Sequence, residues 1–200
     1  MYDIFNNFLF SSAVSKIYHK KEWGNDDNKP WYFAIEGIDG AGKTYFANEL
    51  ETLLRHEKLP YLRVKEPFKE IDPVWASADD FQKDRENYYK DFKEREKWII
   101  SDRSFLSTWA YQNCSEKMET RIKKWIHSKD GLGSWNLCLV FLNSGYDESQ
   151  RNIEKRGEGK EAIENLEIVQ RKALLKYRMA MHREIFDFDA LVKVTPNILP

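Results

Sequence analysis

Residues 31–44 read WYFAIEGIDGAGKT, and this stretch decides the fold. The apolar run 31–35 predicts a buried strand, and the apolar spacing in 45–54 predicts a helix with one apolar face. Residues 37–44, between them, fit the pattern G-x-x-x-x-G-K-[ST]. A strand, a glycine loop and a helix in this order form the context in which the pattern holds phosphate groups. A glycine-rich turn without a ligand is the plainer interpretation, and the flanking strand and helix argue against it.

The parts of this loop suit a nucleotide. Glycine lacks a Cβ atom, so backbone N–H groups can turn inward toward a phosphate, and the next helix adds the positive end of its dipole. Lys43 would reach the β- and γ-phosphates, and the Thr44 hydroxyl would ligate Mg²⁺. We therefore expect ATP and Mg²⁺ as cofactors. The expected nucleotide-binding residues of the loop are Gly37, Asp39, Gly40, Ala41, Gly42, Lys43 and Thr44.

The composition is that of an ordinary globular chain. It has 200 residues, 42% of them hydrophobic and 32% charged, with a net charge of −1. One domain with a substantial core is expected, without a general attraction to nucleic acid or membrane. Cys114 and Cys138 form no metal-like pair, and no apolar run has the length of a membrane span. We expect a cytoplasmic protein that acts on a small molecule without membrane or nucleic-acid partners; a homodimer is one assembly left open.

Short apolar runs alternate with helical stretches along the rest of the chain. Further strands are predicted at 61–65, 98–101, 137–142 and 190–194. Helices are predicted at about 75–97, 105–113, 115–128, 147–156 and 160–186. This alternation predicts an α/β fold with a five-stranded parallel sheet and helices on both of its faces.

Residues 1–29 precede the domain, which we place at 30–200. Ile4, Phe5, Phe8, Leu9 and Val14 have the spacing of a short amphipathic helix, and a linker follows. We expect this helix to dock on the domain surface or on a partner. Neither a signal peptide nor a mitochondrial presequence is expected, because polar residues interrupt the apolar run and no arginine precedes Arg55.

A second informative stretch begins where the apolar run 98–101 ends. Asp102 and Arg103 leave the end of a predicted strand together. The carboxylate suits the shell of a metal ion, and the guanidinium suits a bidentate grip on phosphate. A structural Asp–Arg ion pair is the bland interpretation of this motif taken alone.

Four segments together resemble the thymidylate kinase family of P-loop nucleoside monophosphate kinases. They are residues 35–44 with the loop aspartate, 81–85 as F-x-x-D-R, 102–103 followed by 110–112, and the arginine-bearing stretch 151–158 with 163–164. The last segment is similar to the lid of the bacterial type. The resemblance spans most of residues 31–178 and implies a P-loop kinase fold with a mobile lid at about 145–162.

The resemblance implies roles around the pyrimidine and its sugar. Phe81 would stack on the thymine face, and Arg85 would hydrogen-bond its edge. Thr108 stands where the family has Ser or Asn near the base, and Tyr111 would pack under the sugar beside Gln112. A place in the hydrophobic core is the plainer interpretation of Phe81.

The resemblance also implies roles around the phosphates. Arg103 would hold the acceptor phosphate, and Asp39 would lie between acceptor and metal. Arg151 and Arg156 would close over the triphosphate, although the second of them lies in what could be a solvated charge run. Asp102 would join Thr44 at the metal. The expected catalytic residues are Lys43, Arg103, Arg156 and Asp39.

The implied activity is ATP-dependent phosphorylation of a pyrimidine deoxynucleotide, with dTMP to dTDP as the first choice. Departures from the family lie on the acceptor side, where 65–69 replaces Arg-Glu-Pro-Gly-Gly and Ser104 replaces Tyr or His. Glu66 and the run 102–104 also resemble deoxynucleoside kinases, in which Glu66 would be a general base for a hydroxyl acceptor. A kinase of a modified pyrimidine, free or in DNA, is a third possibility, and a nucleotide-binding module without turnover is a fourth.

Overall fold

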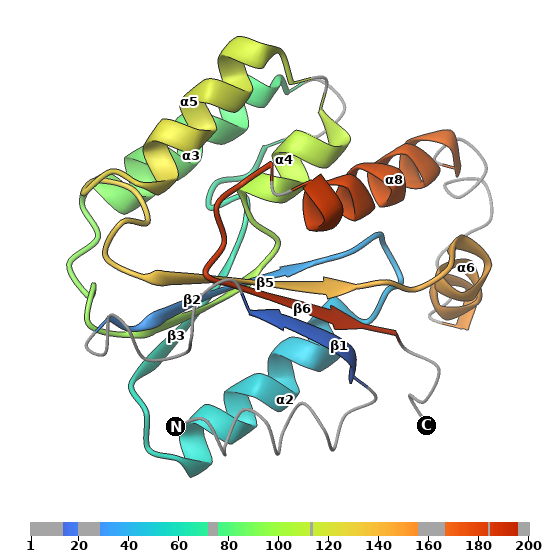
Figure 1. The fold of residues 1–200 in the computed structure, drawn as a ribbon, viewed down its shortest axis with the longest axis horizontal. Helices are drawn as coiled ribbons and strands as arrows, with labels where there is room; N and C mark the ends of the chain where they lie inside the picture. The colour runs from blue at the N-terminus through green and yellow to red at the C-terminus, as the bar shows by residue number, and fades with distance from the viewer. Residues whose placement is uncertain are drawn as a thin grey trace.

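The computed structural model describes residues 14–19, 29–71, 76–112, 114–155, 167–183 and 185–195. Its elements in chain order are β1 (Val14–His19), β2 (Trp31–Glu36), α2 (Lys43–His56), β3 (Tyr61–Lys65), α3 (Ala78–Lys90), β4 (Trp98–Asp102), α4 (Phe105–Tyr111), α5 (Glu116–Ile126), β5 (Asn136–Leu142), α6 (Tyr146–Lys155), α8 (Glu167–Arg183) and β6 (Ala190–Val194). The strands form a six-stranded sheet in the order β1-β6-β5-β2-β4-β3 (Figure 1). Neighbours run parallel except β1, which is antiparallel to β6.

The five parallel strands confirm the prediction, each within one residue of its expected bounds. The sixth strand, β1, is not among the predicted elements. Residue 14 was expected in a helix, but 14–19 form an edge strand whose register runs from Val14–Val194 to His19–Ala190. The rest of the expected helix lies outside the described residues. A strand suits this place because β6 would otherwise present a row of unpaired backbone groups at the sheet edge.

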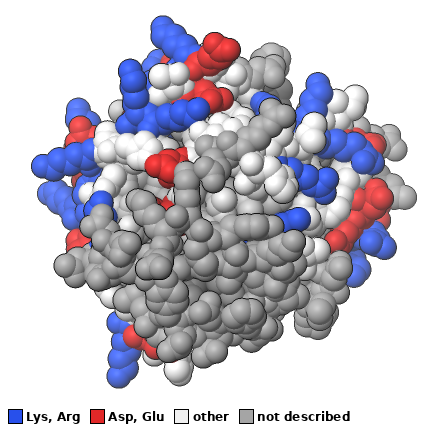
Figure 2. Space-filling model, viewed as in Figure 1, with Lys and Arg blue, Asp and Glu red and all other residues white. Residues whose placement is uncertain are grey.

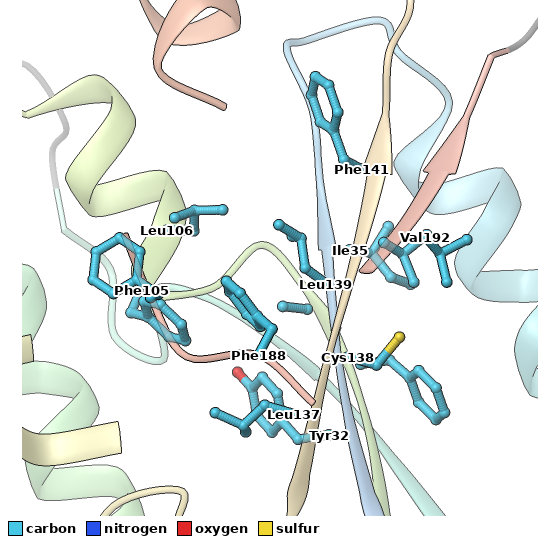
Figure 3. Packing of buried hydrophobic residues seen from close by; sticks show 14 of the residues in the cluster. Tyr32, Ile35, Phe105, Leu106, Leu137, Cys138, Leu139, Phe141, Phe188 and Val192 are labelled. Atoms are coloured by element: carbon cyan, nitrogen blue, oxygen red, sulfur yellow. The ribbon is translucent and has the colours of Figure 1, made fainter. Parts of the chain in front are cut away.

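Helices cover both faces of the sheet. In Figure 1, α2 lies on one face, α3, α4, α5 and α8 lie on the other, and α6 lies beyond the carboxyl end of β5. Every residue of β2 and β4 is buried, as expected for strands between two helical layers. Figure 3 shows the resulting core, in which the ring of Phe105 lies 5.9 Å from that of Phe188. This packing fixes the start of α4 against the segment that leads into β6.

The surface carries both signs of charge. On the face seen in Figure 2, the Lys and Arg side chains of the described residues are interspersed with Asp and Glu. None of the helices in the described ranges combines the length and the apolar run needed to cross a bilayer.

The middle of the sheet is where the order of the strands reverses. From β2 the chain goes to β3 and β4 on one side, and then to β5 and β6 on the other. In open parallel sheets, ligands bind outside the carboxyl ends of the strands at such a point. The loop after β2 and the end of β4 both lie there, next to each other, because β2 and β4 are paired.

Candidate active site

The glycine loop joins β2 to α2 with a backbone shape that needs glycine. Gly40 and Gly42 have φ angles of +79° and +90°, in the left-handed region. A Cβ atom on Gly40 would lie 2.2 Å from the carbonyl oxygen of Ser149 in α6. The Asn152 side chain of α6 also donates to the Gly40 carbonyl at 2.9 Å. The predicted loop is therefore present, and it packs closely against α6.

Lys43 points into this loop. Its buried Nζ donates to the carbonyl oxygens of Gly37 at 3.0 Å and Ile38 at 2.9 Å, and it lies 3.7 Å from an Asp39 carboxylate oxygen. Burial, helped by the charge of Arg103, lowers the pKa of Lys43 to about 8. An anionic phosphate in the loop would favour the charged amine and raise this pKa again.

Thr44 and Asp102 meet at the first turn of α2. The Thr44 hydroxyl donates to the Asp102 carboxylate at 3.1 Å, and an Arg63 guanidinium nitrogen lies 3.8 Å from the same oxygen. A hydroxyl and a carboxylate are oxygen ligands of the kind that Mg²⁺ prefers. Among the described residues, no group of three or more His, Cys, Asp or Glu side chains gathers as a metal site. The pair therefore fits an ion that takes its other ligands from phosphates and water.

Arg103 connects this region to a cavity. Its φ angle of +76° is uncommon for a residue with a side chain and is typical of strained functional positions. The guanidinium pairs with the Asp39 carboxylate and lies 5.5 Å from the centre of the Tyr111 ring. Burial opposes ionisation of Asp39, but the charges of Arg103 and Lys43 outweigh it and hold the pKa of that carboxyl below its usual value. The ion pair is thus stable at neutral pH.

A cavity of about 570 Å³ lies beside this ion pair. All the predicted substrate-binding residues line it: Asp39, Glu66, Phe81, Arg85, Arg103, Thr108, Tyr111 and Gln112. Lys65, Pro67 and Ser104, which the sequence marked within its departures from the family, also line it. No site role followed from the sequence for the remaining lining residues, which are Ile71, Ser107, Val169 and Gln170. Phe81 is half-buried at the wall, so it is neither a core residue nor a free surface residue. The fold therefore brings together the acceptor-side residues; their individual roles remain predictions.

One wall of the cavity contains a buried ion pair. Nε and Nη2 of Arg85 donate to one Glu66 oxygen at 2.8 and 2.6 Å. Arg85 also donates to Thr108 at 3.0 Å and to Gln82 at 2.7 Å. Burial raises the pKa of Glu66, and the guanidinium pulls it back toward the ordinary range. Glu66 is thus already engaged by a positive charge.

Two further polar residues hold the site together. Glu36, at the end of β2, is fully buried and accepts from the hydroxyls of Ser104 at 2.6 Å, Ser107 at 2.7 Å and Tyr177 at 3.0 Å. It therefore fixes α4 and α8 against the loop. Gln170 of α8 contacts Asp39. Glu36 could have been found as the one charged residue in the run 31–36, whereas nothing in the local pattern marks Gln170.

The lid is only partly within the described residues. Arg151 is exposed on α6. Arg156 and the rest of 156–166 lie outside the described residues. The role of both arginines and the lid itself remain predictions.

Comparison with known proteins places this geometry in context. No protein-family model matches the chain. It is 30% identical over 179 residues to a probable thymidylate kinase of Sulfurisphaera tokodaii, a match covering 82% of this chain and 90% of that protein. It is 27% identical over 149 residues to the thymidylate kinase of Mycoplasma genitalium, covering 65% and 71%.

Two solved structures of a deoxyadenosine kinase from M. mycoides have a similar fold. One has bound dATP, and the other has bound dCMP and dCDP as products; their TM-scores are 0.53 and 0.54. They are 18% and 19% identical to this chain, cover 84% of it, and are themselves covered to 92% and 91%. At this identity the likeness shows a shared fold.

Proposed function

The chain belongs to the thymidylate kinase family, and from this premise we propose that it phosphorylates a pyrimidine deoxynucleoside monophosphate, taking dTMP to dTDP. Membership of the family makes the chain a phosphotransferase that acts on a nucleotide. ATP as the donor, Mg²⁺ as the metal ion and dTMP as the acceptor are the proposed part.

The position of Arg103 is the observation that carries the choice of acceptor. Its guanidinium lies at the border between the phosphate loop and the cavity, where an acceptor phosphate would have to be. Glu66, the candidate base for a hydroxyl acceptor, is instead bound by Arg85 on another wall. A guanidinium beside the phosphate loop and an engaged carboxylate favour an acceptor that is already an anion.

The chemistry then requires no general base. An oxygen of the acceptor phosphate forms a bond to the γ-phosphorus, and the bond from that phosphorus to the β–γ bridging oxygen breaks. Because two anions must approach, the residues have to offset repulsion and fix alignment. We assign Lys43 to the donor phosphates and Arg103 to the acceptor phosphate, with Asp39 orienting Arg103. Arg151 and Arg156 would add positive charge if the lid closes.

Thr44 and Asp102 would hold the Mg²⁺ ion, which when bound neutralises charge on the β- and γ-phosphate oxygens. The rest of the loop, with its glycines and the N-terminus of α2, would supply N–H donors to the same phosphates. No further residue is assigned to the metal ion.

Arg85, on the cavity wall that contains the buried ion pair, gives a reason for proposing thymine as the base of the acceptor. The contacts among the described residues use four of the five guanidinium N–H bonds, which leaves one Nη1 N–H for a ligand. A donor suits the carbonyl at position 4 of thymine or uracil and opposes the amino group of cytosine. Phe81 would stack on the ring, while Thr108, Tyr111 and Gln112 would contact base and sugar.

An acceptor screen with Mg-ATP tests this proposal. It compares dTMP, dUMP, dCMP and 5-substituted dUMP with thymidine and a DNA oligomer, and measures both ADP formation and the phosphorylated product. We expect turnover of dTMP, with kcat/KM for dCMP lower by a factor of about 100 or more because a buried donor is left facing a donor. Turnover of thymidine alone, or of the oligomer alone, would replace the proposal with the corresponding kinase; ATP binding without turnover would make the chain a binding module.

We further propose that the enzyme acts on the free nucleotide in the cytoplasm, without a membrane or nucleic-acid partner. The net charge of −1 and the interspersed charges on the face seen in Figure 2 support the absence of a membrane or nucleic-acid partner. Light scattering at several protein concentrations would show whether it works as a monomer or as a homodimer.

A further inference from the structure

Gln170 is a buried polar residue that the proposed reaction leaves without a role. It lies in α8, is 3% exposed, and lines the cavity. Its Oε1 accepts from the backbone N–H of Asp39 at 3.2 Å and from the Tyr111 hydroxyl at 3.0 Å. Its Nε2 donates to the second carboxylate oxygen of Asp39 at 2.9 Å. The amide therefore contacts the phosphate loop and α4 at once.

The partners allow only one orientation of this amide. A backbone N–H can only donate, and an ionised carboxylate can only accept. The oxygen of Gln170 must therefore face the Asp39 N–H, and its nitrogen must face the Asp39 carboxylate. Burial raises the pKa of Tyr111, so its hydroxyl keeps the proton that it donates. A glutamate or a leucine at this position could not reproduce the pattern at neutral pH.

These contacts close a ring of four side chains. Asp39 bonds to Gln170 with one oxygen and pairs with Arg103 through the other. Arg103 lies over the Tyr111 ring, and Tyr111 returns to Gln170. The ring joins the phosphate loop, the end of β4, α4 and α8. Arg103, the residue assigned to the acceptor phosphate, is thus held by two neighbours that Gln170 itself holds.

We propose that Gln170 is the positioning residue of the acceptor-phosphate site, acting through Asp39 and Tyr111 on the placement of Arg103. This inference rests on the proposed function and adds a residue to it. Gln170 does not carry charge to the reaction; it fixes which oxygen of Asp39 faces Arg103. Because a displacement of about 1 Å in such a site can cost a factor of 100 in rate, the residue has a measurable effect on catalysis.

The substitution Gln170→Glu provides a readout that a purely structural role would not give. It keeps the shape of the side chain but sets a carboxyl group against the Asp39 carboxylate, and two such groups share a proton. The charged and titratable groups facing it are Asp39, Lys43, Arg103 and Tyr111. When protonated, the new carboxyl donates to Asp39 as the amide does. When pH rises through its raised pKa, it ionises and repels Asp39.

We therefore expect kcat/KM for dTMP to fall about 10- to 100-fold at pH 8 and much less at pH 6, with an ionisation that the wild type lacks. Gln170→Met, which removes all three hydrogen bonds, should lose activity at every pH without this ionisation. Leu175→Glu is the matched control, because it places a carboxylate on the same helix at a side chain that is 60% exposed. The control should keep the profile of the wild type.

The outcomes separate this inference from the proposed function. A wild type that phosphorylates no monophosphate would overturn the proposed function, and the inference with it. A wild type that phosphorylates dTMP, beside a Gln170→Glu variant with an unchanged pH profile and rate, would overturn the inference alone. Loss of folding in both Gln170 variants, seen by circular dichroism, would assign the residue to stability and overturn its positioning role.

Discussion

Lys43 has to stay charged in a place where burial works against its charge. In the free protein its pKa is lowered to about 8, chiefly by burial, whereas an ordinary lysine titrates near 10.5. A bound triphosphate would reverse this shift, because opposite charges favour the protonated amine. Binding of the nucleotide should therefore take up a proton between pH 8 and the higher pKa of the complex.

This linkage predicts a pH-dependent affinity for ATP. The contribution of Lys43 is fully present below pH 8 and is lost as pH rises above it, so the Kd should increase by up to about tenfold for each pH unit. Calorimetric titration at pH 7.5, 8.5 and 9.5, in two buffers of different ionisation enthalpy, measures both the Kd and the proton uptake. Lys43→Met should bind weakly without this dependence, and Lys172→Met, at an exposed lysine, should behave as the wild type. A constant wild-type Kd over this range would contradict the assignment.

Arg103 and Glu66 give opposite predictions for the two kinds of acceptor. With a monophosphate, Arg103→Gln removes a charge-assisted contact worth about 1.5–3 kcal/mol, or one to two decades in kcat/KM. Glu66 has no proton to accept from such an anionic acceptor, so Glu66→Gln should have the smaller effect on kcat/KM. With a nucleoside, Glu66→Gln would remove the base and cost about 10²–10⁴-fold.

The buried ion pair between Glu66 and Arg85 limits the temperature at which these variants can be assayed. Glu66 and Arg85 are both nearly inaccessible, so Glu66→Gln leaves a buried guanidinium without its counter-charge. The cost to stability is about 3–5 kcal/mol. Both variants must therefore be assayed with dTMP and thymidine below their melting temperatures. Dominance of Glu66→Gln, with thymidine as the better substrate, would show that the acceptor has been misassigned.

At the scale of elements, α6 depends on the absence of a side chain at Gly40. An added Cβ atom would lie 2.2 Å from the Ser149 carbonyl oxygen, and the φ angle of +79° costs a residue with a side chain about 1–2 kcal/mol. Gly40→Ala should therefore lower the Tm by about 2–8 °C and weaken ATP binding. Gly145→Ala is the matched control, since a Cβ atom there would have nothing within 4 Å. Equal melting temperatures for the two variants would contradict both the strain expected at Gly40 and the close packing of α6 on the loop.

The sequence predicted those elements whose local residue pattern is sufficient to identify them. β5 is an apolar run buried on both faces, and the glycine loop has a fixed spacing, so both could be located without a structure. The cavity residues followed from local motifs that the sheet topology gathers at one edge. The contact of Gln170 with Asp39 joins residues 131 positions apart, and an amide on an amphipathic helix adds nothing to its periodicity.

The same reasoning explains why the prediction of a helix that includes residue 14 was wrong. Whether residues 14–19 form a helix or a strand is decided by the open edge of β6, far along the chain, and the local pattern does not contain that information. The boundaries of α3 show a related effect. The predicted helix of 75–97 is shortened to 78–90, where Ser77 and Asp80 form a capping box.

For the whole molecule, the order of the strands decides where the candidate active site lies and which strand would become an unpaired sheet edge. β2 and β4 at the centre hold the phosphate loop and the pair Asp102 and Arg103. The outer strand on one side is β1, and without it β6 would be an exposed edge. The candidate active site at β2 and β4 is therefore separated from the edge strand β1 by β5 and β6. We expect a mutation in one of these regions to change activity or stability without affecting the other.

Removal of β1 tests this separation. A chain that begins at residue 29 lacks β1, while a chain that begins at residue 13 keeps it and serves as the control. We expect the shorter chain to melt about 5–10 °C lower and to aggregate more readily, because β6 loses its backbone partner along 190–194. Its kcat/KM at a temperature well below melting should remain within about threefold of the control, since the residues of the cavity and the loop are held by β2, β4, α4 and α8. The measurements are thermal unfolding by circular dichroism, light scattering and steady-state turnover of dTMP. Equal stability of the two chains would mean that β1 adds nothing to the sheet, and a large loss of activity in a folded shorter chain would mean that the N-terminal strand belongs to the active site.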